Sequence, residues 1–174
     1  MMKLFKMFYP DDWKVSTYAI DFQWLYRKGY RGIIFDIDNT LGPHGAPADE
    51  RAKALFDDLK AMGFDCCLLS NNKEPRVKMF NEEIGVHYVF KAGKPKKAGY
   101  EKAMRVMHTT RRNTLFVGDQ LFTDVWGASR IGIYSILVLP IHPKEEIQIV
   151  LKRYLEKIVL FFYRKERGFG PDGD

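Results

Sequence analysis

The segment IIFDIDNTLG (residues 33–42) decides the fold, because it places acidic side chains directly after an apolar run. The apolar run, residues 33–35, is typical of a strand buried on both faces, as in a parallel sheet. Asp36 and Asp38 would then lie at the carboxyl edge of that sheet, where open α/β sheets bind their ligands. The segment therefore predicts a parallel sheet with a functional site at its edge.

The rest of the chain alternates between predicted strands and predicted helices. The periodicity predicts strands over residues 32–36, 64–69, 87–90, 114–117 and 134–138. It predicts helices over residues 21–28, 49–63, 74–84, 97–107 and 124–131. This alternation predicts an α/β fold: a doubly wound, Rossmann-like parallel sheet of about five strands with helices on both faces.

The composition is that of one folded unit, since 174 residues with 46% hydrophobic residues can bury a single substantial core. We expect residues 1–30 to form an aromatic, basic segment with a short helix packed on the core. Residues 31–167 would form the core with a C-terminal amphipathic helix, and residues 168–174 a flexible tail. Cys66 and Cys67 are adjacent within an apolar stretch, so we expect both to be reduced and buried.

The charge pattern limits the class of partner. The formal net charge of +6 favours an anionic partner, which could be a phosphorylated substrate, nucleic acid or an acidic membrane surface. Because the basic residues are dispersed and no nucleic-acid motif is present, we do not expect nucleic acid. With no secretion signal and no membrane-spanning run in the sequence, we expect a cytoplasmic protein.

Polar residues follow the predicted strands at regular places. They are Asp36 and Asp38 after the first strand, Ser70, Asn71 and Asn72 after the second, Lys94 beyond the third, and Gly118 and Asp119 after the fourth. In a parallel sheet these positions converge on one edge, where neighbouring carboxylates are stabilised by a hard cation such as Mg²⁺. Lys94 and the Ser70 hydroxyl would then face the oxygens of a phosphoryl group.

Four segments resemble, in their order and spacing, the four motifs of the haloacid-dehalogenase (HAD) superfamily of phosphohydrolases. They are DIDNT (residues 36–40), LLSNN (68–72), GKPKKAGY (93–100) and GDQLFTD (118–124). The resemblance covers about residues 32–138. The first and last segments are also similar to the small bacterial YqeG-type phosphatases, which are similar to the mitochondrial phosphatidylglycerophosphate phosphatase.

This resemblance implies a role for each matching residue. Asp36 would be the nucleophile that forms an aspartyl-phosphate, and Asp38 would be the general acid and base. The carboxylate at position 38 argues for phosphate chemistry, because relatives that act on carbon–halogen bonds lack it. The resemblance implies a catalytic Lys94 that offsets negative charge. It also implies substrate binding by Thr40, Ser70, Asn71, Asn72 and Lys94.

The resemblance also implies a Mg²⁺ ion as cofactor. The Asp36 carboxylate, the Asp38 main-chain carbonyl and Asp119 would hold the ion. Asp124 would either reach a metal-bound water or orient Lys94.

No cap domain fits between the motifs. Thr40 and Ser70 are separated by 29 residues, and Ser70 and Lys94 by 23, and one helix and one strand already fill each span. The chain is therefore similar to the capless members, subclass III of the superfamily. This implies an open site, suited to a macromolecule, a lipid head group or a substrate enclosed by a neighbouring subunit.

The sequence thus predicts a Mg²⁺-dependent phosphomonoester hydrolase with several candidate substrates. The resemblance favours a phospholipid head group such as phosphatidylglycerophosphate, while a sugar phosphate, a nucleotide or a phosphoprotein would also fit an open pocket. The second class of function is a HAD-fold module that binds RNA or a protein with little turnover.

The C-terminal segment, residues 144–167, has the pattern of an amphipathic helix. Its apolar stripe is predicted to pack on the sheet and comprises Ile147, Val150, Leu151, Tyr154, Leu155, Ile158, Phe161 and Phe162. The opposite side carries Ile149, Leu160 and Tyr163 among Lys152, Arg153, Lys157 and Arg164. We hypothesise that this side rests on an anionic membrane, peripherally at its inner face, or on a second subunit. Leu4, Phe5, Met7 and Phe8, near Lys3 and Lys6, would assist it, although an apolar surface without a partner explains the pattern equally well.

Overall fold

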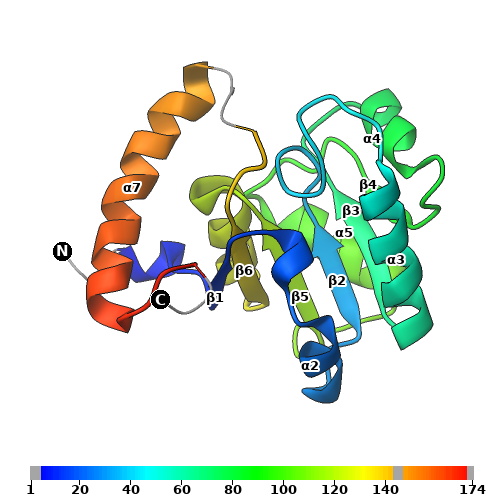
Figure 1. Ribbon diagram of the computed structural model, residues 1–174, viewed down its shortest axis with the longest axis horizontal. Helices are drawn as coiled ribbons and strands as arrows, with labels where there is room; N and C mark the ends of the chain where they lie inside the picture. Colours follow the sequence, from blue (N-terminus) through cyan, green and yellow to red (C-terminus); the bar gives the residue numbers. More distant parts are fainter. Residues whose placement is uncertain (1–4, 143–146, 172–174) are drawn as a thin grey trace.

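The computed structural model describes residues 5–142 and 147–171, and Figure 1 shows one sheet flanked by helices. The strands are β1 (Asp12–Lys14), β2 (Gly32–Phe35), β3 (Asp65–Leu69), β4 (His87–Val89), β5 (Thr114–Gly118) and β6 (Tyr134–Val138). Every pairing is parallel, and the strand order is β1-β6-β5-β2-β3-β4. The predicted α/β parallel sheet is therefore confirmed.

The sheet has one strand more than the sequence predicted. This strand is β1, which pairs with β6 and aligns Trp13 with Leu137. It is only three residues long, and an alternating pattern cannot be recognised over so short a stretch.

The helices lie close to the predicted ranges. They are α2 (Phe22–Arg27), α3 (Glu50–Met62), α4 (Glu74–Asn81), α5 (Lys97–Val106), α6 (Trp126–Ile131) and α7 (Ile147–Arg167). Three short helical turns are η1 (Lys6–Phe8), η2 (Thr17–Ala19) and η3 (Leu121–Val125). The predicted helix over residues 124–131 therefore begins as the π-helical turn η3, and only its second part is α6.

Helices cover both faces of the sheet because its strands are apolar on both sides. Ile33 and Phe35 of β2 pack in one core with residues of α2, α3 and α4. Ile34 points to the other face and packs with residues of α5 and α6. Only α3 lies between β2 and β3, and only α4 between β3 and β4, so no cap domain is inserted at either place.

Helix α7 lies beside the β1–β6 edge of the sheet (Figure 1). Its buried residues show that a different face points inward from the one predicted. Tyr163 is fully buried, and its ring packs 5.2 Å from that of Tyr9. Val159 is also buried, so the inward face is narrow. The predicted core stripe was wrong, since most of its large side chains are exposed, Leu151 to 68% and Phe161 to 64%. The prediction that the side with Leu160 and Tyr163 faces a membrane or a second subunit was also wrong, because both side chains pack in the core.

We call the five most exposed large apolar side chains in the described part of α7 the outer stripe. It consists of Leu151, Tyr154, Leu155, Ile158 and Phe161. The apolar pattern misplaced the inward face because that face contains the charged pair Arg153 and Glu156, which a hydrophobicity argument assigns to solvent. The helix predicted from residue 144 is described from Ile147 onward, and the side chain of Ile147 lies outside the described residues.

The aromatic N-terminal segment packs against the rest of the chain in part. The Phe5 ring stacks on Phe162 at 5.6 Å, and Phe8 contacts Phe122 and Trp126 edge-on. Met7 is partly exposed. Lys3 and Leu4, which the sequence assigned to the same surface, lie outside the described residues.

Within the described ranges, no helix is both long and apolar enough to cross a lipid bilayer.

Candidate active site

The predicted site residues lie on loops that follow four neighbouring strands. Asp36 follows β2, Ser70 follows β3, Lys94 lies beyond β4, and Asp119 follows β5. The four strands are parallel neighbours, so their carboxyl ends meet at one edge of the sheet. All four side chains belong to buried residues.

Lys94 forms the centre of this cluster. Its Nζ lies 2.5 Å from Asp36 Oδ1 and 2.7 Å from Asp124 Oδ1. All three side chains are almost completely buried. The lysine therefore joins the first and the fourth motif through two charge-assisted hydrogen bonds.

Burial and charge act against each other in this cluster. Burial raises the pKa of Asp36 to about 6, although the nearby Lys94 ammonium lowers it. Burial lowers the pKa of Lys94, but the carboxylates of Asp124 and Asp36 outweigh burial and raise it overall. Lys94 therefore stays a cation and favours the ionised form of Asp36.

Asp119 is linked both to the first motif and to α7. The Thr40 hydroxyl lies 3.2 Å from Asp119 Oδ1 and 3.3 Å from Asp36 Oδ2, so its single proton is shared between the two carboxylates. Arg153 of α7 donates from Nη2 to Asp119 Oδ2 and from Nη1 to the Asp119 main-chain oxygen. Burial, followed by the charges of Asp36 and Asp124, holds the pKa of Asp119 well above its ordinary value, and Arg153 offsets only part of this.

Arg153 is held in place by Glu156, one turn further along α7. Arg153 Nη1 lies 2.9 Å from Glu156 Oε2. The other carboxylate oxygen of Glu156 accepts a hydrogen bond from the Leu121 amide of η3 at 2.8 Å. A charged pair on the C-terminal helix thus forms one wall of the site.

The side chain of Asp38 lies apart from the other three aspartates and is partly exposed. Its Oδ2 accepts a hydrogen bond from Asn72 at 2.6 Å, and its Oδ1 accepts one from Arg76 of α4 at 2.7 Å. The Gly45 amide also donates to Oδ1, at 3.0 Å. Its carboxylate is therefore held at the open side of the site by groups from α4 and from two loops.

Side chains of the loop after β3 form hydrogen bonds within this loop and to the backbone of Lys94. Ser70 Oγ accepts from the Asn72 amide at 3.1 Å. The Asn71 side chain accepts from the Lys94 amide at 2.7 Å and donates to the Lys94 carbonyl at 3.2 Å. Asn71 therefore fixes the backbone of Lys94, and Asn72 fixes Asp38.

Gly118 leaves the space that Asp124 needs. A Cβ at position 118 would lie 2.5 Å from Asp124 Oδ2, closer than any real carbon contact. The Gln120 amide donates to the same oxygen at 3.1 Å. The Tyr100 hydroxyl of α5 lies 2.9 and 3.2 Å from the main-chain oxygens of residues 123 and 124 and shares its proton between them. This contact holds the turn η3 that carries Asp124.

The N-terminal segment supports the first motif from outside the sheet. The Thr17 hydroxyl donates to the Thr40 carbonyl at 2.7 Å, and the Tyr18 hydroxyl donates to the Leu41 carbonyl at 2.6 Å. Asn39 adopts a left-handed conformation with a φ of 63°, which asparagine tolerates better than most residues. The loop carrying Asp38 and Thr40 is therefore held by segments distant in sequence.

The donor set fits a hard divalent cation. Asp36, Asp119 and Asp124 are buried, and one carboxylate oxygen from each lies within 4.8 Å of the others. With Glu156 added, four buried carboxylates face the two cations Lys94 and Arg153 among the described contacts. This excess of buried negative charge, together with the raised pKa of Asp119, is what a divalent ion with oxygen ligands would offset. The Asp38 carboxylate does not belong to this triad.

Three charged residues of the site were missed by the sequence analysis. Arg76, Arg153 and Glu156 lie on helices outside the four motifs. Arg153 was predicted to point away from the core among other cations, and that prediction was wrong. Charged residues are ordinary on helix surfaces, so no signal in the sequence distinguishes these three.

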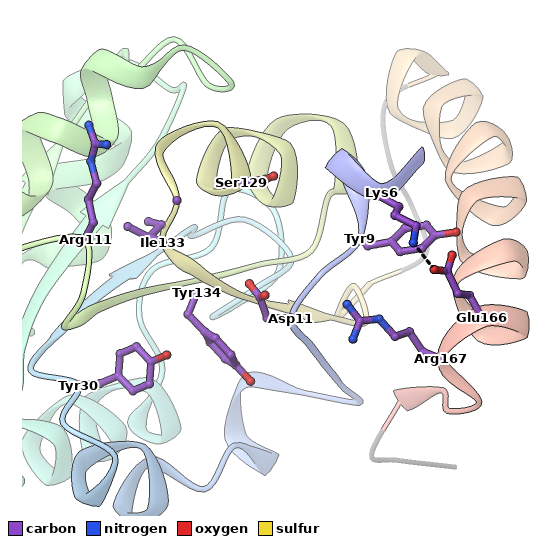
Figure 2. Close-up of a pocket in the computed structure, with 11 residues that line it drawn as sticks. Lys6, Tyr9, Asp11, Tyr30, Arg111, Ser129, Ile133, Tyr134, Glu166 and Arg167 are labelled. Carbon is purple, nitrogen blue, oxygen red and sulfur yellow. Dashed lines mark ion pairs between the residues drawn. The ribbon is translucent and has the colours of Figure 1, made fainter. Parts of the chain in front are cut away.

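A hollow lies at the opposite, amino-terminal edge of the sheet (Figure 2). Its lining includes Asp11, Tyr30 and Arg111, which precede strands, and Ile133 next to the start of β6. Lys6 and Glu166 form an ion pair of 2.5 Å on one side, as the figure shows. The aspartate triad and Lys94 are not part of this lining, so we place the candidate site at the carboxyl edge.

The family described as HAD-hydrolase-like matches residues 91–140, which carry Lys94, Asp119 and Asp124. Across most of its length the chain is also similar to a protein of Bacillus subtilis named "Probable phosphatase YqeG". The two are 35% identical over 156 residues, which cover 89% of this chain and 91% of the relative.

Two plant and algal proteins are more distant relatives. The chain is 30% identical to "Phosphatidylglycerophosphate phosphatase 1, chloroplastic/mitochondrial" of Arabidopsis thaliana, over 79% of this chain and 45% of the relative. It is 26% identical to "Phosphatidylglycerophosphate phosphatase 1, chloroplastic" of Chlamydomonas reinhardtii, over 87% of this chain and 59% of the relative.

Two solved structures share the fold. An uncharacterized protein from Listeria monocytogenes superposes with a TM-score of 0.53 and 16% identity, covering 74% of this chain and 98% of that chain. An uncharacterized protein from Corynebacterium glutamicum superposes with a TM-score of 0.52 and 20% identity, covering 74% of this chain and 94% of that chain. At such identities the likeness concerns the fold alone.

Proposed function

Because this chain belongs to the YqeG-type phosphatases of the haloacid-dehalogenase superfamily, we propose that it hydrolyses a phosphomonoester through a covalent aspartyl-phosphate on Asp36. The observation that carries the proposal is the buried cluster in which Lys94 contacts both Asp36 and Asp124, with Asp119 beside them. Phosphoryl transfer requires a nucleophilic carboxylate, a fixed cation and further carboxylate oxygens that can bind a metal ion.

In the first step, Asp36 attacks phosphorus and the bond from phosphorus to the leaving oxygen breaks. Asp38 gives its proton to that oxygen, so the alcohol leaves as a neutral molecule. In the second step, Asp38 takes a proton from water, whose oxygen bonds to phosphorus. The bond between Asp36 and phosphorus then breaks, which releases phosphate and restores the carboxylate.

The remaining residues hold the reacting groups and offset charge. Lys94 offsets the charge shared by Asp36 and the phosphoryl group, and its contact with Asp124 favours the role of Asp124 in orienting Lys94. Thr40, Ser70 and Asn71 lie at the same edge, and we propose that Ser70 donates to a phosphoryl oxygen. Asn72, together with Arg76, positions the Asp38 carboxylate.

The Asp36 and Asp119 carboxylates and the Asp38 main-chain carbonyl would hold Mg²⁺, which supplies positive charge to the phosphoryl oxygens when bound. The site suits this ion because, among the described contacts, its buried carboxylates outnumber the cations that contact them.

The proposed substrate is a phospholipid head group such as phosphatidylglycerophosphate. Two relatives carry this substrate in their names, at 30% and 26% identity. Among the described residues no cap is inserted between β2 and β4, and α7, whose Arg153 contacts Asp119, carries the exposed outer stripe on another face. An open site next to an exposed apolar surface suits a substrate embedded in a lipid layer.

We further propose that α7 rests peripherally on an anionic membrane surface. The outer stripe is flanked on the same helix by Lys157, Arg164 and Lys165. A second copy docking through the same face would bring these cations against their own counterparts, whereas an anionic lipid surface would pair with them.

The activity is tested by hydrolysis of p-nitrophenyl phosphate with Mg²⁺. We expect Asp36→Asn to lower kcat by at least about 10⁴-fold, as the loss of a covalent nucleophile does in other hydrolases. Asp57→Asn, at an exposed site of α3, serves as the matched control and should retain full activity. Equal activity of Asp36→Asn and the wild type would show that the assigned nucleophile is wrong.

Comparing kcat/KM over a panel of phosphomonoesters that includes phosphatidylglycerophosphate identifies the preferred substrate. We expect the lipid to give the highest kcat/KM. If the wild type hydrolyses none of the panel, a binding module with the phosphatase fold becomes the better interpretation.

A further inference from the structure

A groove opens between α7 and the end of β6, and Asp119 lies in its wall. Its volume is about 580 Å³, within the roughly 300–1,000 Å³ typical of small-molecule sites. One side of the groove comes from residues 137–140 and the other from α7. Asp36 is not part of the lining, but one carboxylate oxygen of Asp119 lies within 4.8 Å of one of Asp36, so Asp119 links the groove to the proposed nucleophile.

The lining of this groove is mainly apolar. Trp13, Leu137, Val138, Leu139, Leu160 and Phe161 form most of its surface. A cleft with such walls binds hydrocarbon, because removing apolar surface from water is favourable. A sugar or a nucleotide would leave polar groups without partners along the apolar part of these walls.

Among the residues that the structure describes, three cations and two carboxylates, Asp119 and Glu156, line the same groove, and both carboxylates are paired with Arg153. Arg153 stands next to Asp119, and Lys157 and Arg164 follow along α7 towards the other end. The Arg164 guanidinium lies 4.8 Å from the centre of the Trp13 ring. A ligand that matches both the walls and the charges carries a hydrocarbon chain and an anionic group, so it is an amphiphile.

The groove is also continuous with the outer stripe. Phe161 belongs to both, since it lines the groove and is 64% exposed. A chain lying in the groove would therefore lead from the outward surface of α7 to Asp119. This path connects a lipid layer to the catalytic edge without requiring a cap.

We infer that this groove holds the hydrocarbon chain of an amphiphilic phosphomonoester whose phosphate is bound at Asp36. The inference rests on the proposed phosphatase function and adds a specificity site formed by α7 and the end of β6. Leu160 and Leu139, one on each wall, are the residues that we assign to chain selection.

Alkyl phosphates of increasing chain length test this inference. Butyl, octyl and dodecyl phosphate are used below their micelle-forming concentrations, so that monomers alone are compared. With the wild type we expect KM to fall by up to about fourfold for each methylene that enters the groove, while kcat changes little. A KM that does not depend on chain length would overturn the inference.

Variants with a polar side chain on either wall test whether the dependence of KM on chain length arises in the groove. Leu160→Gln should lower the kcat/KM ratio of dodecyl to butyl phosphate by at least about tenfold. Leu139→Gln is the second variant, and because Leu139 is already 40% exposed it should fold normally. Met79→Gln on α4, also 40% exposed and outside the groove, is the matched control and should keep the wild-type ratio. Retention of that ratio by both groove variants would contradict the assignment.

A binding measurement tests the groove inference independently of the proposed phosphatase activity. Dodecylphosphonate cannot be hydrolysed, and calorimetry should show that it binds the wild type at least tenfold more tightly than methylphosphonate does, with the difference lost in Leu160→Gln. If no phosphate ester is hydrolysed, the proposed function fails, and this measurement alone decides the groove. Equal binding of the two phosphonates would refute it.

Discussion

Lys94 balances the charge of the catalytic edge, because its ammonium contacts Asp36 and Asp124 at once. Removing one partner of a buried ion pair leaves the other charges without compensation, which costs more than the pair itself contributes. The residue is therefore expected to matter for folding as well as for the reaction.

We predict that Lys94→Met lowers the free energy of unfolding by about 3–5 kcal/mol. Urea denaturation at neutral pH, in the presence of a chelator, measures this loss without any contribution from metal. Lys97→Met, at an exposed position in the first turn of α5, is the control and should change stability little. A loss of less than about 1 kcal/mol in Lys94→Met would mean that the buried carboxylates are compensated in another way.

Residues at strand ends could be assigned to the site from the sequence, and those on helix faces could not. Asp36, Ser70 and Asp119 meet because parallel strands present their carboxyl ends at one edge, which the chain order already fixes. Arg76 and Arg153 reach the same edge from α4 and α7. Their positions depend on how each helix rotates and docks, and this is decided by packing rather than by local pattern.

At the scale of elements, β3 shows the consequence of burial on both faces. Cys66 packs in the core under α3, and Cys67 in the core under α5. Burial raises the pKa of Cys67 to about 12 and raises that of Cys66 as well. A thiolate therefore forms only as the pH rises towards these values, so both thiols are protonated at pH 8.

We predict that neither thiol reacts with Ellman's reagent in the folded protein at pH 8. Both free cysteines should react after unfolding in guanidinium, when their ordinary pKa values return. Rapid labelling of the native protein would show that β3 opens to solvent and would contradict the double coverage of the sheet.

Helix α7 is the element whose orientation the sequence misjudged, and its function follows from that orientation. The hydrophobic pattern was assigned to the core, yet the helix packs through Val159 and Tyr163 and contacts Asp119 through Arg153. Five large apolar side chains are left outward as the outer stripe. The amphipathic pattern predicted the helix correctly, but a helix with apolar residues on two sides does not reveal which side faces the core.

We predict that Leu151→Glu combined with Leu155→Glu weakens co-sedimentation with vesicles containing phosphatidylglycerol by at least about tenfold, because each buried leucine contributes about 1.5–3 kcal/mol. High salt should weaken binding of the wild type, since cations flank the stripe. Trp24→Glu, an exposed apolar residue on α2, is the control. Equal sedimentation of the double variant and the wild type would refute the membrane contact. A change in oligomeric state instead would point to a second subunit.

At the scale of the whole molecule, segments from both the N-terminal and the C-terminal part of the chain contact the catalytic edge. Thr17 and Tyr18 hold the loop of the first motif, and Arg153 holds Asp119 (Figure 1 shows α7 on the side of β1 and β6). The four motifs are therefore only the inner part of the site. Its outer part is built by segments before residue 31 and after residue 140, which the motif pattern does not cover. We therefore propose that residues 31–167 need the N-terminal segment to form a complete site.

Divalent metal should stabilise the entire fold, because the buried carboxylates repel one another without it. At a hundredfold excess of Mg²⁺ over its Kd, binding to the native state adds about 2.7 kcal/mol, which for a chain of this size raises Tm by about 5–10 °C. Scanning calorimetry with Mg²⁺ and with a chelator measures the shift. Asp119→Asn should abolish most of it, since the variant loses a proposed ligand. Asp38→Asn should keep it, because only the main-chain carbonyl of that residue is proposed to bind the ion. A shift that survives in Asp119→Asn but disappears in Asp38→Asn would place the metal at the open side of the site and not within the buried triad.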